Sequence, residues 1–193
     1  IINVAIDNNA DVLILGAFGC GAFMKSQDEA FALAEEMVKI GKNAGRKTIA
    51  VISDMDQPLG RAVGNTLEVK EAIATLRGEG PEDFRELCMV LGSQMLLAGG
   101  KAENAEEARG MLTKVIEDGS ALRKLEQFVE AQGGDPQAVT NPELLPKASM
   151  VVPVCADRDG FVGRIACEDI GICSLLLGGG RETKESTIDL SVG

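Results

Sequence analysis

Residues 48–71 read TIAVISDMDQPLGRAVGNTLEVKE, and the change of pattern inside this stretch decides the predicted fold. The β-branched apolar run at residues 48–52 predicts a buried strand. The chain becomes polar over residues 53–56, and Pro58 then stands where the first turn of a helix would begin, with Asp56 placed to cap it. Open α/β sheets usually bind their ligands where a strand ends and leads into a helix. A well-capped connection without a ligand accounts for the same pattern, and spacing alone favours neither interpretation.

The segment before this stretch has the same alternation of strand and helix. Residues 11–15, DVLIL, predict a short buried strand. Ser26 with Glu29 three residues later forms a capping box that begins a helix, and Gly45 ends it. Strand, helix, strand and helix in succession favour a parallel sheet with right-handed crossovers.

Residues 81–133 carry three helical patterns in succession. The first begins at Pro81, the second at Asn104 with Glu107 three residues later, and the third at Ser120 as its cap. We expect these helices to form a helical layer whose charged side chains make up a solvated face.

The pattern changes after the proline-rich residues 141–147, NPELLPK. Apolar runs at 150–154 and 161–165 predict strands on either side of a DRDG turn. We therefore expect a partial α/β domain over residues 1–148 and the beginning of a C-terminal α+β domain over residues 149–193. The predicted fold class is α/β, with a partial, mostly parallel sheet, flanking helices and a helical layer, followed by a small β-containing unit.

Charge and composition exclude several classes of function. The chain has 193 residues with 19 basic and 30 acidic side chains, and its formal net charge is −11. Such an acidic surface argues against nonspecific binding to nucleic acid or to an anionic membrane. The sequence contains no histidine, which excludes Ser-His-Asp and Cys-His catalysis and histidine zinc sites within this chain.

The cysteines and the hydropathy indicate a cytoplasmic protein. The five cysteines are odd in number and form no CxxC pair, so we expect reduced thiols. The sequence shows no signal peptide and no apolar run long enough to span a bilayer.

A glycine-rich loop follows the first predicted strand. Residues 16–23 read GAFGCGAF, and Gly16, Gly19 and Gly21 have the spacing GxxGxG, which differs from the GxGxxG of dinucleotide-binding turns. Such a loop lets the backbone approach a ligand closely. A tight turn between strand and helix is an equally good interpretation.

Several motifs in order resemble the pyrimidine-nucleoside phosphorylase and thymidine phosphorylase family over about residues 21–193. They are GAFMK at 21–25, DMDQPLGRAVGN at 54–65, EAQGGDP at 130–136, LLPKA at 144–148, ADRDGFV at 156–162 and GGGRETKESTIDLSVG at 178–193. The resemblance implies a homodimeric enzyme that cleaves pyrimidine nucleosides with phosphate as co-substrate, giving free base and pentose 1-phosphate.

The same resemblance assigns roles to four residues of this chain. Phe23 matches the phenylalanine that lines the pyrimidine pocket of the family. Leu59 and Ala62 match positions whose backbone carbonyls bind a structural potassium ion, and Glu71 matches the carboxylate ligand. Without the resemblance, Glu71 would be interpreted as an exposed charge on a helix.

Other parts of the family pattern are missing from this sequence. In the family, the phosphate-binding loop, most base contacts and the remaining potassium ligands lie upstream of the position of Ile1. Both ends of the chain look truncated, so we expect a fragment with no catalytic residue of its own and negligible phosphorolysis alone.

Residues 1–23 resemble a second family, the bacterial-type poly(ADP-ribose) glycohydrolase-like macrodomains, in which a GAFGCGxF loop cradles the diphosphate of ADP-ribose. The sequence therefore leaves two alternatives to a phosphorylase fragment. One is a chimera that binds ADP-ribose or another diphosphate through Gly16, Gly19 and Gly21. The other is a non-catalytic fragment that associates with a fuller copy or a partner.

Overall fold

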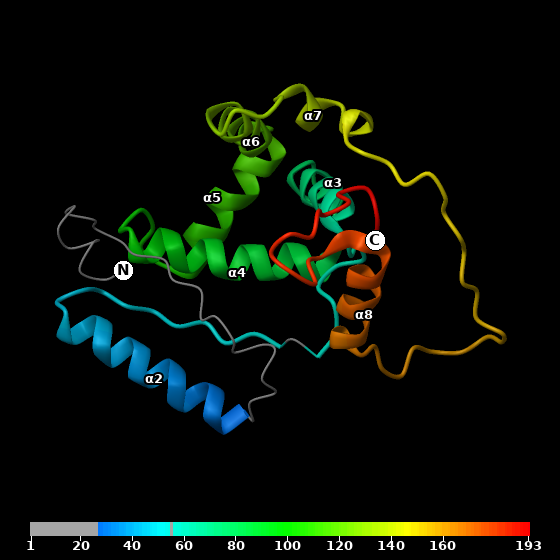
Figure 1. The fold of residues 1–193 in the computed structure, drawn as a ribbon. Coiled ribbons are helices and arrows are strands. Elements are labelled where there is room, and N and C mark those ends of the chain that lie inside the picture. Colours follow the sequence, from blue (N-terminus) through cyan, green and yellow to red (C-terminus); the bar gives the residue numbers. More distant parts are fainter. Residues whose placement is uncertain (1–26, 55) are drawn as a thin grey trace. The chain divides into compact units, whose positions relative to one another are not determined.

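The computed structural model describes residues 27–54 and 56–193, which Figure 1 shows as a coloured ribbon. Contacts divide the chain into two compact units. The first joins the chain up to Asp54 with Leu87–Thr113, and the second joins Met55–Glu86 with Lys114–Gly193.

The described residues form helices joined by turns and extended segments (Figure 1). No helix of this described part has both the length and the apolar character needed to cross a membrane. The α-helices are α2 (Gln27–Asn43), α3 (Asn65–Leu76), α4 (Glu82–Ala98), α5 (Ala105–Glu117), α6 (Ser120–Ala131), α7 (Gln137–Thr140) and α8 (Cys167–Ser174), and the shorter turns are the 3-10 helix η1 (Pro142–Leu144) and the π-helical η2 (Leu175–Gly179).

In the first unit, α2 ends at a glycine turn after which the chain reverses. Gly45 has a φ of +70°, which glycine adopts without strain, and its N–H donates to the Lys42 carbonyl. The Arg46 N–H donates to the carbonyl of Gly41, which is a glycine turn of the Schellman kind. Gly41 itself is buried where a Cβ would overlap the side chain of Thr48. The predicted end of this helix at Gly45 is confirmed.

In the second unit, α3 carries the most buried side chain. Ile73 is 1% exposed, and Val139 on α7 is buried as well. Arg77 follows α3, and its Nη2 donates to the carbonyls of Val139 and Thr140 at 2.9 Å each. The C-terminal end of α3 is therefore tied to α7 by charge-assisted hydrogen bonds as well as by apolar burial.

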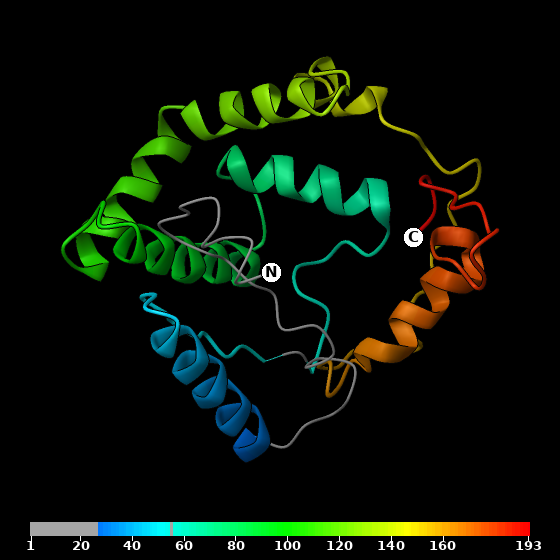
Figure 2. The ribbon, with the colours of Figure 1, turned by 60° about the vertical axis from the view of Figure 1, so that its left-hand side comes forward.

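The beginning of α3 is held by the last residues of the chain. The Thr66 N–H donates to the Leu190 carbonyl at 3.1 Å, and the Asn65 side-chain amide donates to the Gly179 carbonyl at 3.0 Å. The Asp189 N–H donates in turn to the Gly178 carbonyl. Figure 2 shows this C-terminal segment, in red, beside the end of α8 and η2. Groups at both ends of α3 thus find partners more than 60 positions away in the chain.

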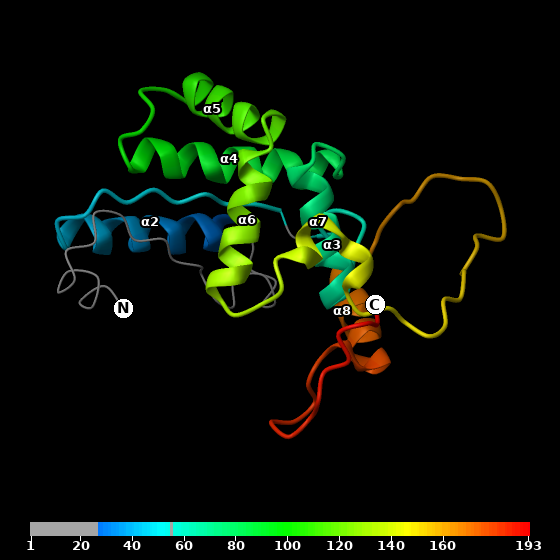
Figure 3. The same cartoon turned by 90° about the horizontal axis from the view of Figure 1, so that it is seen from above.

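The predicted sheet is not seen in the part of the chain that the structure describes. Residues 48–52, 150–154 and 161–165 carry no strand there, and Figure 3 shows the run from α7 to α8, yellow to orange, as a long connection. A strand needs a hydrogen-bonding partner, and the other strand predicted in this part of the sheet, the run at 11–15, lies outside the described residues. Ile49, Val51 and Ile52 are accordingly 39–41% exposed.

The prediction that a helix begins at Pro58 with Asp56 as its cap is wrong. Helix α3 begins at Asn65, and residues 56–64 form bends and irregular backbone. Gly60 and Gly64 have φ values of +72° and +125°, which are incompatible with a continuous right-handed helix. Proline at a first helical position describes only what the local chain permits, and the two glycines delay the helix by nearly two turns.

The two predicted helix caps after α4 have different outcomes. Asn104 Oδ1 accepts the Glu107 N–H at 3.0 Å, and the Glu107 carboxylate accepts the Glu103 N–H at 2.7 Å, so the predicted start of α5 is confirmed. Ser120 does not cap α6, because it is already the first helical residue. The Asp118 carboxylate accepts the Ser120 N–H at 2.8 Å instead.

Candidate functional site

The candidate site is built on the turn that precedes α3, residues 59–62, which we call the LGRA loop after its sequence. Gly60 lies at its centre with a φ of +72°. A Cβ at this position would overlap the Glu71 carboxylate. Glycine is therefore required here twice, for the backbone conformation and for the close approach of Glu71.

Glu71 lies on the second turn of α3 and returns to the LGRA loop. Its Oε1 accepts the Arg61 N–H at 3.0 Å, and its Oε2 lies against the free face of Gly60. The residue is half-buried, so the alternative interpretation of Glu71 as a fully exposed helix charge is wrong. One carboxylate oxygen accepts a hydrogen bond from the loop, and the other lies beside the loop as a candidate ligand oxygen for a cation.

A second carboxylate contacts the same loop from α4. Asp83 Oδ2 accepts the Gly60 N–H at 3.0 Å. This hydrogen bond, followed by those from the Phe84 and Asp83 N–H groups, holds the pKa of the Asp83 carboxyl below its usual value. Asp83 is therefore ionised at neutral pH, and successive N–H groups of the loop, from Gly60 and Arg61, are held by two different carboxylates.

Of the three residues that were predicted to bind potassium, Glu71 contacts Gly60 and Arg61, the two loop residues between Leu59 and Ala62. A carboxylate and the loop that carries the two predicted backbone ligands therefore lie side by side. Hard cations prefer oxygen ligands of this kind. Within residues 27–54 and 56–193, no group of three or more cysteine, aspartate or glutamate side chains gathers as it would around a metal ion. A site made of two carbonyls and one carboxylate is of a different type from such a group.

Asp83 was not predicted from the sequence. Its position two residues after Pro81 indicates only an acidic residue in the first turn of a helix. The contact with Gly60 spans 23 positions in the sequence, and no local sequence pattern indicates it. The other predicted site residues, Phe23, Gly16, Gly19 and Gly21, lie outside the residues that the structure describes.

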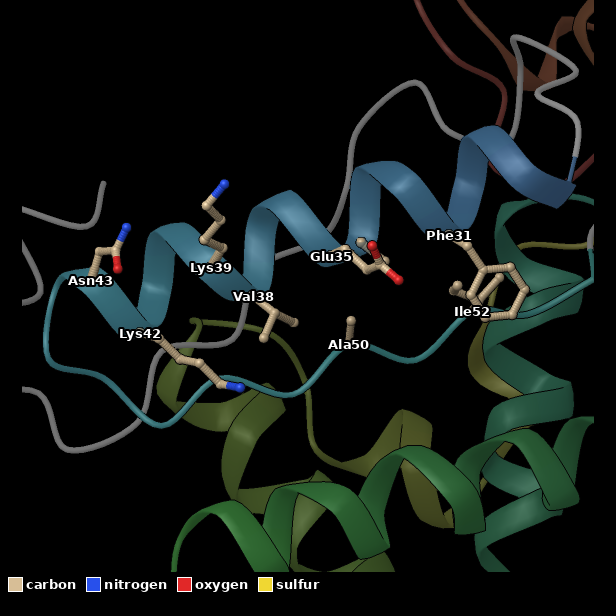
Figure 4. A pocket seen from close by; sticks show the side chains of 9 residues that line it. Phe31, Glu35, Val38, Lys39, Lys42, Asn43, Ala50 and Ile52 are labelled. Carbon is tan, nitrogen blue, oxygen red and sulfur yellow. The ribbon is translucent and has the colours of Figure 1, made fainter.

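The first unit has a shallow pocket of about 540 Å³ between α2 and the extended residues that follow it (Figure 4). Phe31 and Ile52 lie together at one end, and Val38 and Ala50 face each other near the middle. The polar lining comes from four side chains on α2, which are Glu35, Lys39, Lys42 and Asn43. The pocket follows the apolar face of α2, which the predicted sheet would cover, and we assign no chemistry to it.

Comparison with known families gives two matches, in different parts of the chain. Residues 6–122 match the glycosyl transferase family, a/b domain, and residues 161–193 match the pyrimidine nucleoside phosphorylase C-terminal domain. The first match includes the LGRA loop, Glu71 and Asp83.

Individual relatives agree with these matches. The chain is 54% identical to the pyrimidine-nucleoside phosphorylase of Geobacillus stearothermophilus and 52% identical to that of Staphylococcus haemolyticus, in each case over 194 aligned residues that take in all of this chain. The same enzyme from Staphylococcus aureus is 50% identical. The chain spans 45% of the length of each of these relatives.

These alignments also correct the expectation for residues 1–23. The family match begins at residue 6, and the aligned relatives cover all of the chain. The glycine-rich residues 16–23 therefore align within the phosphorylase family, and a separate macrodomain origin is not needed to account for them. With one family model covering more than half of its residues and the second matching its C-terminal end, the chain belongs to the pyrimidine-nucleoside phosphorylase family of glycosyl transferases.

Proposed function

We propose that this chain is part of a pyrimidine-nucleoside phosphorylase, an enzyme that transfers the pentose of a pyrimidine nucleoside to phosphate. In this reaction the bond between the anomeric carbon and the base nitrogen breaks, and a bond between that carbon and a phosphate oxygen forms. The base leaves with the bonding electron pair and takes up a proton. The observation that carries the proposal is the 54% identity to one such enzyme along the entire chain.

The reaction sets clear demands on the site. The sugar gains positive character as the base departs, so the phosphate dianion must be held beneath the ring and the negative charge on the base must be stabilised. We assign Phe23 to the apolar wall of the pyrimidine pocket. We assign no catalytic residue to this chain, and we expect the chain alone to be inactive with nucleoside and phosphate.

We propose that the LGRA loop and Glu71 form part of a potassium site. The supporting observation is that Glu71 Oε2 lies beside Gly60 while Oε1 accepts the Arg61 N–H. The Leu59 and Ala62 carbonyls would complete the contribution of this chain. A bound potassium ion would supply a fixed positive charge that holds this oxygen-rich turn to neighbouring loops.

The remaining features of the proposal concern architecture and location. We propose that residues 1–148 belong to an α/β domain whose sheet includes residues 48–52, and that residues 149–193 begin a C-terminal α+β domain. We also propose a homodimer, and a location in the cytoplasm on the interpretation of the five cysteines as reduced thiols. An acidic chain of this kind is not expected to bind nucleic acid or an anionic membrane.

A complementation assay tests the proposed activity. The purified chain is incubated with uridine or thymidine and phosphate, alone and together with the parts of the Geobacillus stearothermophilus enzyme that this chain does not match. We expect no release of base from the chain alone and measurable release from the mixture. Release of base by the chain alone would refute the expected inactivity, and absence of release from a mixture that forms a stable complex would refute the proposed function.

A further inference from the structure

The contact between Asp83 and the LGRA loop concerns a single peptide unit. The Gly60 N–H, which donates to Asp83 Oδ2, and the Leu59 carbonyl are the two ends of the same planar amide. No cis peptide bond occurs among the described residues, so the two groups point in opposite directions. Holding the N–H at Asp83 therefore directs the Leu59 carbonyl oxygen away from α4.

This restraint matters because the LGRA loop has few other means of keeping its shape. Gly60 has the widest backbone freedom of any residue type, and Leu59 is an exposed side chain that does not anchor the loop by burial. Glu71 holds the next peptide through the Arg61 N–H and leaves the Leu59–Gly60 amide free to rotate. Asp83 supplies the missing restraint from a separate helix.

We propose that Asp83 is a positioning residue of the potassium site, which keeps the Leu59–Gly60 peptide in one orientation so that the Leu59 carbonyl stays available to the cation. The inference rests on the proposed potassium site and adds a residue that does not touch the ion. The two acidic residues have different roles in this proposal. Glu71 is a ligand of the potassium ion, and Asp83 acts only through the Gly60 N–H.

The test follows potassium binding by NMR, using the backbone amide signals of Gly60 and Arg61. Potassium chloride is titrated into the isotope-labelled chain complemented with the parts of the Geobacillus stearothermophilus enzyme that it does not match, because the proposed site has ligands from both, while choline chloride keeps the ionic strength constant. The variants are Asp83→Ala, which removes the acceptor, and Asp83→Asn, which keeps a neutral oxygen in the same place. The matched control is Glu82→Gln, which removes a carboxylate one position earlier on the same helix.

We expect the amide shifts of the unaltered chain to saturate with potassium, and Asp83→Ala to weaken the apparent affinity about fivefold, which corresponds to the loss of one ordinary solvent-exposed hydrogen bond. Asp83→Asn should recover part of this loss, and Glu82→Gln should bind as the unaltered chain does. Hydrogen exchange at the Gly60 amide should become faster in Asp83→Ala, with Arg61 changed less.

The failures of the two proposals are distinguishable in the same experiment. If the unaltered chain in the complemented enzyme shows no saturable response to potassium, the potassium site fails, and this inference with it. If the chain binds potassium and Asp83→Ala binds it equally well, the inference alone is overturned. Unchanged exchange at the Gly60 amide in Asp83→Ala would overturn it independently of any ion.

Discussion

The LGRA loop and residues 149–166 are both without regular secondary structure, yet they differ in what holds them. Successive N–H groups of the loop donate to Asp83 and Glu71. The second segment contains apolar side chains that remain in solvent, such as Val154 at 95% exposure. The comparison shows that an irregular turn is well defined when its N–H groups find side-chain acceptors, here 10 and 23 positions away, whereas a strand-like run needs a partner strand.

The largest expected effect comes from the core of the second unit. Ile73→Ala should lower the free energy of unfolding by about 2–5 kcal/mol, because it empties a fully buried position. Val154→Ala should change it by less than about 0.5 kcal/mol, because the side chain is exposed. Urea unfolding followed by circular dichroism measures both. Equal losses of unfolding free energy in the two variants would show that residues 149–166 are packed. The difference between this segment and the core of the second unit would then not exist.

The next effect comes from Gly64, at the end of the turn. Its φ is +125°, and a Cβ there would overlap the backbone at Val192. Gly64→Ala should therefore cost about 1–3 kcal/mol of stability, through backbone strain and displacement of the C-terminal residues from α3. Gly163→Ala is the matched control, since a Cβ at Gly163 meets nothing within 4 Å. A cost for Gly163→Ala as large as that for Gly64→Ala would contradict the assigned difference.

A smaller effect separates two helix starts that look alike in sequence. Asn104→Ala should destabilise the chain by about 1 kcal/mol, because its side chain accepts the Glu107 N–H. Ser120→Ala should change stability by no more than about a few tenths of a kcal/mol, because Ser120 is inside α6, where alanine is favoured over serine, and does not cap it. Thermal unfolding of the two variants side by side measures the difference. Equal shifts in Tm would place a cap at Ser120 after all.

The smallest effect concerns pH and again distinguishes the LGRA loop. The pKa of Asp83 is lowered in the folded chain, mainly by the Gly60 N–H, so its contribution to stability is present above the unfolded value of about 3.8 and is lost as the pH falls through the folded value. A carboxylate NMR titration should show Asp83 titrating below the ordinary aspartate value of 3.8. A midpoint at or above that value would indicate that the hydrogen bond to Gly60 is not formed in solution.

The sequence predicted local features of the fold well and long-range ones poorly. Gly45 and Asn104 act on groups within a few positions, and both predictions hold. Gly60 and Gly64 were not predicted to interrupt the helix, because their conformations depend on Glu71 and on the C-terminal residues. The local pattern by itself predicted that the helix begins at Pro58.

The candidate site shows the same limit. Leu59, Ala62 and Glu71 were identified only through resemblance to a family, because backbone carbonyls leave no signature in side-chain spacing. Asp83 was missed by pattern and resemblance alike, since its partner is a backbone N–H 23 positions away. The sheet stays a prediction, because the other strand predicted in this part of it, the run at 11–15, lies outside the described residues.

The most direct test of the whole account is the potassium dependence of uridine phosphorolysis in the complemented enzyme. Turnover is measured in potassium chloride and in choline chloride, with this chain unaltered, with Glu71→Gln, and with Glu79→Gln as an exposed control. The account predicts that potassium raises turnover, and that Glu71→Gln requires a higher potassium concentration while Glu79→Gln does not. Turnover that is equal in both salts, or equally potassium-dependent with Glu71→Gln, would contradict the assignment of Glu71 and the LGRA loop.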